Sequence, residues 1–291
     1  MTDRYLWDSF VIGLPESYRG EPLEASLHSA GITFHRSPGV IVPPEFSHLT
    51  DRTAAHVLLR RDLHRSEIGC ALAHRDVYRR MLDQGLDFAL VLEDDARLSG
   101  LTPETLERFI AHTDPAMPTV ALLYAPQGSV VVADDRPTSG FLRAVVPPTT
   151  TTAYIVSRRA ASILLGDDAP VSHVADWPVA ASATCQFWVA ESNLVLPADG
   201  ESTIGDRATV SSSTARILRR LAAVTHLRWF AHRRVYGSYG NYASHELLRG
   251  PLYRSATRSG VRNWMPPVGV RVLARVLMGP RSRRLRRVDH D

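Results

Sequence analysis

One stretch of the 291-residue sequence constrains its fold more than any other. The apolar residues 88–92 run directly into three adjacent carboxylates, Glu93, Asp94 and Asp95. A short, uninterrupted apolar run is typical of a strand buried on both faces, as in a parallel sheet. Ligands of open α/β sheets bind at the carboxyl ends of the strands, which is where this acidic cluster is expected to lie.

The acidic cluster points to a cation. Three adjacent anions repel one another, and burying them unpaired would cost several kcal/mol apiece. Carboxylate oxygens are natural ligands for Mg²⁺ and Mn²⁺, which commonly bridge one or two carboxylates to a substrate phosphate. The cluster therefore predicts a metal–diphosphate site. The alternative is an acidic turn that simply ends a strand in water.

Composition sets the broad class. The apolar fraction of 44% and the charged fraction of 22% are ordinary for a soluble globular protein. All 34 basic residues are arginines, whose guanidinium groups suit phosphate and carboxylate partners. A net charge of +4 favours anionic partners but is too small to indicate nucleic acid, and we expect none.

The sequence lacks the usual signals for export or for a zinc site. Its first residues hold no apolar core of a signal peptide, and no run of about 20 apolar residues occurs. A cytoplasmic protein is therefore expected. Cys70 and Cys185 lie far apart in a spacing typical of neither zinc sites nor disulfide frameworks, so neither is predicted.

The chain opens with a pattern typical of a βαβ unit. Residues 9–14 predict a strand, residues 21–30 a helix ended by Gly31, and residues 32–34 a second strand. This order favours a parallel sheet. Arg19, in the loop after the first strand, is placed to meet a phosphate, or else is a solvated loop arginine.

The longest helical signal spans residues 66–82, with Ser66 as its expected cap and Gly85 closing the following turn. Glu67 and His74 lie seven residues apart and therefore share one edge of the helix. They could line a pocket, although His74 could equally be a boundary histidine with satisfied hydrogen bonds. The expected core face consists of Ile68, Ala71, Leu72, Tyr78 and Leu82.

The middle of the chain continues the alternation of predicted strands and helices. Thr151, Thr152 and Tyr154 offer the hydroxyl groups that a sugar-binding wall would need, although threonines also simply favour strands. Asp176 lies beside Trp177, a combination common at carbohydrate sites, and is the candidate general base. A capping aspartate beside a core tryptophan is the alternative. Helices are expected at 102–112 and 158–165, and strands at 119–124, 130–133, 153–157 and 186–190.

The character of the sequence changes at residue 211. Residues 1–210 are expected to form the main domain, and 211–291 a helical, Arg-rich extension with a flexible tail from about residue 280. Residues 270–278 are amphipathic and lead into five further arginines. Such a segment could contact an anionic membrane surface on its cytoplasmic side, at about 1 kcal/mol per basic residue. A solvated tail is the alternative.

Several segments together resemble one family. Residues 67–74, 90–95, 152–157, 176–177 and 202–204 are similar, in this order, to glycosyltransferase family 25. That family comprises lipopolysaccharide and lipooligosaccharide glycosyltransferases and is related to the collagen galactosyltransferases. The resemblance covers about residues 9–205. It implies an α/β fold of the GT-A type with a mostly parallel central sheet flanked by helices.

The resemblance also implies a reaction: inverting, metal-dependent transfer of galactose or another hexose from a UDP-sugar to a hydroxyl of a glycan or lipid-linked glycan of the cell envelope. Asp95 and Asp94 would hold Mn²⁺ or Mg²⁺, and Asp176 would be the base by its position in the family pattern. The donor would be contacted by Glu93, Arg19, Glu67, His74, Thr152 and Tyr154.

The sequence departs from the family pattern at three places. Gly13 and Leu14 stand where the family usually has Asn-Leu, Arg19 stands alone where it has an arginine pair, and Ala73 replaces the usual serine before the histidine. The first two departures affect the expected nucleotide contacts. They motivate a rival hypothesis, a non-catalytic glycan- or nucleotide-sugar-binding protein on a degenerate transferase fold.

Overall fold

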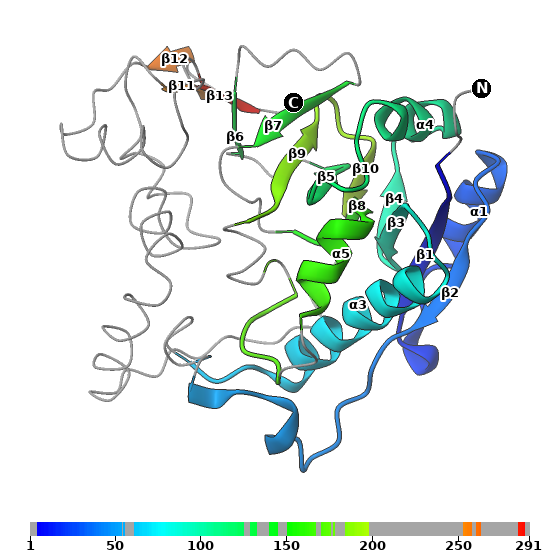
Figure 1. Cartoon of the computed structure of the whole chain (residues 1–291), viewed down its shortest axis with the longest axis vertical. Coiled ribbons are helices and arrows are strands. Elements are labelled where there is room, and N and C mark those ends of the chain that lie inside the picture. Colours follow the sequence, from blue (N-terminus) through cyan, green and yellow to red (C-terminus); the bar gives the residue numbers. More distant parts are fainter. Residues whose placement is uncertain are drawn as a thin grey trace.

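One large sheet organises the structure (Figure 1). The computed structural model describes residues 5–53, 55, 61–124, 129–132, 140–144, 150–166, 170–175, 177, 184–197, 253–257, 260–262 and 285–288. Within these residues, eleven strands pair into one sheet. Their order is β12 (Gly260–Arg262), β11 (Tyr253–Thr257), β13 (Leu285–Val288), β6 (Ser129–Val132), β7 (Phe141–Ala144), β9 (Gln186–Ala190), β5 (Thr119–Leu122), β8 (Ala153–Ser157), β3 (Phe88–Glu93), β1 (Trp7–Gly13) and β2 (His35–Pro38).

The half of the sheet from β9 to β2 is mostly parallel. Strand β1 is parallel to β2 and β3, and β5 is parallel to β9. Strand β8 lies between β3 and β5 and is antiparallel to both. The expected α/β class, with a large, mostly parallel central sheet flanked by helices, is therefore confirmed. The single reversed strand matters for the site, because the start of β8 meets the end of β3.

Helices cover both faces of this half of the sheet. Helices α3 (Arg65–Asp83) and α5 (Arg158–Leu165) pack on one face, and α1 (Glu21–Ser29) and α4 (Pro103–Ala111) on the other. Strand β3 shows why a continuous apolar run is needed here. Ala89 and Val91 belong to the core under α3 and α5, while Phe88, Leu90 and Leu92 belong to the core under α1 and α4.

Local sequence signals fix several helix ends. The hydroxyl of Thr102 accepts a hydrogen bond from the backbone N–H of Thr105 at the start of α4. The hydroxyl of Ser157 does the same for Ala160 at the start of α5. Gly31, with φ of 72°, ends the turn after α1 in a conformation that favours glycine.

Two expectations about local structure were wrong. The second strand is His35–Pro38 rather than residues 32–34, and Ile32 instead packs in the core beneath α1. Helix α3 begins one residue earlier than expected, with His64 rather than Ser66 at its N-cap. The backbone N–H of His64 donates to the Glu67 carboxylate at 2.9 Å, so this glutamate caps the helix.

The buried face of α3 also differs from the expected one. Ile68, Ala71 and Tyr78 are buried as expected, but Leu72 and Leu82 are only partly buried. The fully buried positions further along the helix are Val77 and Met81. The core stripe is therefore rotated slightly around the helix, and this rotation brings His74 fully into the interior.

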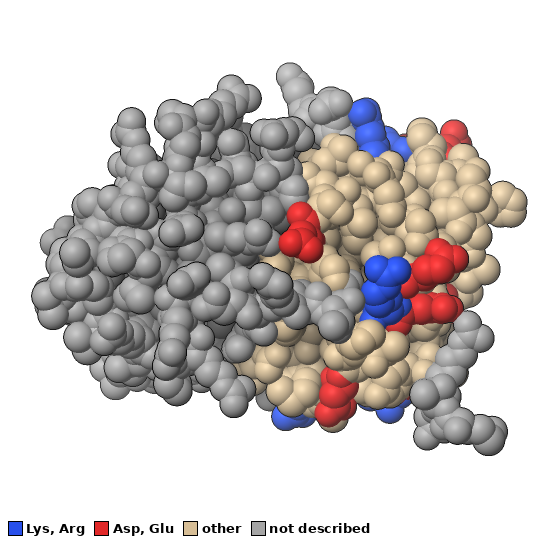
Figure 2. All heavy atoms as spheres, turned by 90° about the horizontal axis from the view of Figure 1, so that it is seen from above, with Lys and Arg blue, Asp and Glu red and all other residues tan. Residues whose placement is uncertain are grey.

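Most of the expected C-terminal extension lies outside the described residues. Strands β11, β12 and β13 are its described parts, and the division at residue 210, the helical character and the tail remain predictions. Among the described helices, none is long and apolar enough to cross a bilayer. On the face drawn in Figure 2, the charged side chains of the described part stand in small groups of both signs.

Candidate active site

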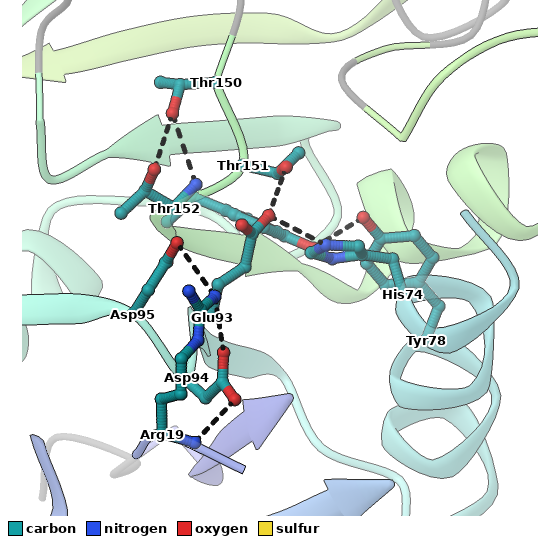
Figure 3. Close-up of polar contacts among 10 residues, drawn as sticks. Arg19, His74, Tyr78, Glu93, Asp94, Asp95, Thr150, Thr151 and Thr152 are labelled. Carbon is teal, nitrogen blue, oxygen red and sulfur yellow. Dashed lines mark hydrogen bonds and ion pairs between the residues drawn. The ribbon is translucent and has the colours of Figure 1, made fainter. Parts of the chain in front are cut away.

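The acidic cluster lies where β3 ends, between the end of β1 and the start of β8 (Figure 3). The backbone N–H of Asp94 donates to the carbonyl of Ile12 in β1 at 2.8 Å. The backbone N–H of Glu93 donates to the carbonyl of Thr152, just before β8, at 2.9 Å. The chain then turns through Asp94 and Asp95 into β4 (Ala96–Leu98). These hydrogen bonds fix the backbone that carries the three carboxylates.

The three carboxylates do not act as one group. Glu93 points toward Thr151 and His74, whereas Asp94 and Asp95 face Arg19 (Figure 3). The alternation of side chains along a strand explains the split, because Glu93 continues the face of Ala89 and Val91, which α3 covers. Residues adjacent in sequence therefore belong to two separate sets of contacts.

Arg19 holds Asp94 and Asp95 together. Its NH2 nitrogen lies 3.7 Å from Oδ1 of Asp94 and 3.5 Å from Oδ2 of Asp95. Its backbone N–H also donates to Oδ2 of Asp94 at 3.0 Å. The side chain of Asp94 is 11% exposed, that of Asp95 35% and that of Arg19 47%. One positively charged nitrogen thus lies between two carboxylates that remain accessible from solvent.

The loop that carries Arg19 is held by Tyr18. The Tyr18 hydroxyl donates to Glu24 of α1, and the guanidinium of Arg36 lies 4.5 Å above the centre of the Tyr18 ring. Arg36 also binds Glu24 through two hydrogen bonds of 2.5 and 2.7 Å. Burial and the hydrogen bond to Glu24 raise the pKa of Tyr18, so its hydroxyl remains a donor.

The electrostatics of the pair favour a cation. Burial and the negative charge of Glu93 raise the pKa of Asp95, and Asp94 adds to the effect while Arg19 opposes it. Negative charge at the end of β3 is therefore only partly compensated by Arg19. The donor set consists of hard carboxylate oxygens, which fit Mg²⁺ or Mn²⁺. Asp94 and Asp95 are the residues that could hold such an ion.

Glu93, whose side chain is 27% exposed, begins a hydrogen-bonded chain that runs into the buried interior. Its Oε1 accepts from the Thr151 hydroxyl at 2.5 Å and lies 3.4 Å from Nε2 of His74. Nδ1 of His74 lies 2.8 Å from the Tyr154 hydroxyl, which lies 2.6 Å from that of Tyr78. Burial opposes ionisation of Glu93, but these partners outweigh it and lower its pKa.

The other predicted donor contacts lie in different places. Glu67 is fully buried, 2.6 Å from both NH1 and NH2 of Arg61, in a bidentate ion pair. Tyr154 is completely buried, and burial raises its pKa well above its ordinary value. Thr152 is 8% exposed, and its hydroxyl lies 2.9 Å from that of Thr150. Their predicted contacts with a donor remain predictions.

The structure describes Trp177 but not its neighbour Asp176, so only one of the two predictions made for this pair can be compared with it. Asp176 lies outside the described residues, so its role as general base remains a prediction. Trp177 is 3% exposed and packs edge-on against Tyr154 and Phe187, with ring centroids 5.4 and 5.1 Å away. The reading of Trp177 as a core residue is therefore the one that the structure supports.

The site contains contacts that the sequence reading missed. Thr151 was expected only as part of a hydroxyl-bearing wall, yet it binds Glu93 directly. Gly13 was noted as a departure from a pattern, and its position explains the choice of residue. A side-chain carbon there would lie 2.5 Å from the Tyr18 ring and 2.7 Å from Asp94. The alternation along β3 could have predicted that Glu93 faces α3.

Comparison with known protein families gives one clear match. Residues 8–177 match the model described as glycosyltransferase family 25 (LPS biosynthesis protein). This range covers more than half of the chain and includes both the helix bearing His74 and the acidic cluster. No curated protein matches the chain.

Three solved structures show a distant likeness to this chain. A glycosyltransferase involved in glycosylation of the major capsid of PBCV-1 aligns at 14% identity with a TM-score of 0.27, over 55% of this chain and 63% of that chain. A197 from STIV aligns at 12% identity and a TM-score of 0.38, over 69% and 98%. Mannose-1-phosphate geranyltransferase from Thermus thermophilus aligns at 12% identity and 0.28, over 63% and 74%.

Proposed function

The chain belongs to glycosyltransferase family 25, and from this premise we propose that it transfers a hexose, galactose being the first candidate, from a UDP-sugar to a hydroxyl of a cell-envelope glycan. The acceptor is a free or lipid-linked glycan, and the reaction inverts the anomeric carbon and requires Mn²⁺ or Mg²⁺. The observation that supports this proposal most is the position of Asp94 and Asp95, side by side at the carboxyl end of β3 around one guanidinium nitrogen.

Asp94 and Asp95 have the chemistry that a diphosphate site requires. A divalent ion held between them would stabilise negative charge on the departing diphosphate, an effect worth several kcal/mol. The pKa of Asp95 is raised by burial and by Glu93, and a divalent charge in this position would relieve that repulsion. The Arg19 guanidinium, nearly half exposed beside the pair, is placed to offer a second positive charge to the phosphates.

The sugar transfer itself requires a base. In an inverting displacement the acceptor oxygen bonds to the anomeric carbon on the face opposite the diphosphate, which leaves with the bonding electron pair. The acceptor proton passes to a carboxylate, which contributes about 10²–10⁴-fold to the rate. We assign this role to Asp176 from its position in the family pattern.

The test begins with a screen of nucleotide sugars for thermal stabilisation in the presence of Mn²⁺. A bound donor at 100 times its Kd should add about 2.7 kcal/mol to the free energy of unfolding. Asp95→Asn should lose the Mn²⁺-dependent part of this stabilisation and the UDP release that accompanies sugar transfer to acceptors. The matched control is Asp83→Asn, an exposed aspartate at the C-terminal end of α3. This variant should retain both the Mn²⁺-dependent stabilisation and the release of UDP. Turnover near wild type in Asp95→Asn would refute the metal assignment.

A second candidate function rests on Gly13. The space that a side chain at this position would need is filled by Tyr18 and Asp94, so one contact of the usual family pattern has no room here. A protein altered in this way could bind a nucleotide sugar without transferring it. Release of UDP separates the two functions, since a binding protein would be stabilised by the donor but release no UDP.

For the Arg-rich residues 211–291 we propose peripheral contact with an anionic membrane. Their arginines supply the charge for such contact, at about 1 kcal/mol per residue near the surface. Sedimentation with liposomes containing an anionic phospholipid, compared with liposomes of neutral lipid, measures it. Equal sedimentation with both, or with neither, would contradict the proposal.

A further inference from the structure

A second group of metal-ligating side chains lies beneath the acidic pair. Cys70 and His74 project from α3, one helical turn apart, and Glu93 ends β3. Their ligand atoms, a sulfur, a ring nitrogen and a carboxylate oxygen, all lie within 4.8 Å of one another. We propose that Cys70, His74 and Glu93 form a binding site for a thiophilic divalent cation, Zn²⁺ being the first candidate, separate from the Asp94–Asp95 pair.

Secondary structure brings the three ligands together. Residues at i and i+4 of a helix lie on the same side, so Cys70 and His74 face the same part of the sheet. Glu93 faces them because it continues the side of β3 that α3 covers. A pair of cysteines in the usual zinc spacing is therefore unnecessary, and this is why the sequence alone predicted no such site.

Two of the three ligands, His74 and Glu93, are already oriented by outer partners (Figure 3). Nδ1 of His74 lies 2.8 Å from the Tyr154 hydroxyl, which leaves Nε2 directed at Glu93, 3.4 Å away. Thr151 donates to Oε1 of Glu93 at 2.5 Å. Histidines that bind metals usually engage their second ring nitrogen in this way, and so do ligating carboxylates.

The distances require only small adjustments. Zinc bonds of about 2.0–2.3 Å in a tetrahedral site place ligand atoms about 3.5 Å apart. The separation of 3.4 Å between His74 and Glu93 already corresponds to that value. The remaining separations, at most 4.8 Å, can close through side-chain rotation of Cys70 and Glu93. A bound cation would replace the direct contact between His74 and Glu93.

The ligand types distinguish this site from the acidic pair. A thiolate and an imidazole select Zn²⁺, Co²⁺ or similar ions, whereas carboxylates alone suit Mg²⁺ and Mn²⁺. Three protein ligands also leave a fourth tetrahedral position open for water or another ligand. The two sites are therefore expected to bind different cations, the softer ions at Cys70, His74 and Glu93 and the harder ions at Asp94 and Asp95. This inference does not depend on the proposed transferase activity.

Cobalt is a suitable probe, because a thiolate bound to Co²⁺ gives a charge-transfer band in the near ultraviolet. The chain has only two cysteines, so only Cys70 and Cys185 could produce that band. Cys185→Ser is the matched control, since burial raises the pKa of the Cys185 thiol to about 12 and keeps it protonated. Titration of the full chain with Co²⁺, followed by displacement with Zn²⁺, measures the site.

The expected result is a band that saturates near one equivalent of Co²⁺ in the wild type, in Cys185→Ser and in Asp95→Asn, and that disappears in Cys70→Ser. Tyr154→Phe keeps the buried ring but removes the hydroxyl partner of His74, and it should weaken Co²⁺ binding about 10- to 100-fold. Thermal melting of each variant without metal checks that the fold is retained.

Three outcomes would overturn the proposal. The first is a wild type without the band at saturating Co²⁺, which would leave the three side chains as ordinary packing and hydrogen-bonding partners. The second is a band that persists in Cys70→Ser or is lost in Cys185→Ser. The third is loss of the band in Asp95→Asn, which would show that the cation bound through Cys70 also depends on Asp95 and that the two sites are not separate.

Discussion

The carboxylate of Asp94 lies against Gly13, so that a side-chain carbon at position 13 would come within 2.7 Å of its Oδ2 atom. The same carbon would also meet the Tyr18 ring at 2.5 Å. The end of β1 therefore needs a residue without a side chain for the acidic pair to take its observed position. Any side chain at position 13 should therefore disturb the position of Asp94.

Gly13→Ala is expected to displace Asp94 and to lower Mn²⁺-dependent UDP affinity by about 10-fold or more, which corresponds to a loss of about 1.4 kcal/mol of binding free energy. Isothermal titration with UDP and Mn²⁺ measures the change. The control is Gly31→Ala, where the new carbon meets nothing within 4 Å but the backbone has φ of 72°. That variant should lose about 1 kcal/mol of folding stability and keep its UDP affinity. Unchanged UDP affinity in Gly13→Ala together with reduced UDP affinity in Gly31→Ala would contradict the role of Gly13.

The buried ion pair of Arg61 and Glu67 provides a prediction about stability. Arg61→Met leaves the Glu67 carboxylate buried without its bidentate partner and should lower the free energy of unfolding by about 3–5 kcal/mol. The double variant Arg61→Met/Glu67→Met should recover most of that loss. Urea denaturation measures both.

The control for Arg61 is the exposed ion pair of Arg52 and Asp62, in which Arg52→Met should cost at most about 1 kcal/mol. The double variant also tests the predicted donor contact of Glu67. If Arg61→Met/Glu67→Met regains stability but does not bind UDP, Glu67 contributes to donor binding in addition to capping the helix.

The pH dependence of folding should report on His173. Burial lowers the pKa of His173 to about 4, from an ordinary value of 6.5, and Nδ1 has no hydrogen-bond partner among the described residues. Between pH 6.5 and 4 the unfolded chain therefore binds a proton that the folded chain does not. Stability should fall as the pH decreases through this window, by at most about 3 kcal/mol.

His173→Gln should abolish that part of the pH dependence. Urea denaturation at about pH 4.5 and about pH 7, on either side of most of this window, compares the variant with the wild type. His28→Gln, at an exposed position in α1, is the control. Equal slopes of stability against pH in the wild type and His173→Gln would show that His173 is protonated equally in the folded and unfolded chains.

Asp176→Asn tests the predicted base. Loss of the proton acceptor should lower kcat by about 10²–10⁴-fold while donor affinity stays within a factor of about three. Single-turnover release of UDP, together with titration of the donor, separates the two quantities. Lost donor affinity with unchanged kcat would assign Asp176 to binding instead.

The sequence predicted those parts of the fold that depend on local patterns. Strand β3, helix α4 and helix α5 were expected within a residue or two, because a continuous apolar run and the caps Thr102 and Ser157 are local signals. Strand β2 was misplaced because it lies at the edge of the sheet. Its exposed His35 and Arg36 give no apolar alternation, whereas the more apolar Ile32 belongs to the core under α1.

The sequence singled out candidate site residues, but it did not predict how they are grouped. The acidic cluster and His74 were singled out from the sequence, and the structure brings Glu93 of the cluster within 3.4 Å of His74, while their roles remain predictions. Their partition depends on pairings between distant segments, such as Thr151 with Glu93 and Arg19 with Asp94, which no local pattern encodes. The antiparallel placement of β8 beside β3 is likewise a property of the assembled sheet.

The division of the acidic cluster between the two sides of β3 has a practical consequence for engineering. Exchange of Glu93 alters what the interior beneath α3 accepts and reaches Asp95 through charge alone, since Glu93 raises the pKa of Asp95. Exchange of Asp94 or Asp95 instead alters the contacts with Arg19. A combined replacement of all three residues would merge the loss of two different sets of contacts into one phenotype. Mutagenesis of this protein should therefore change position 93 in one set of variants and positions 94 and 95 in another.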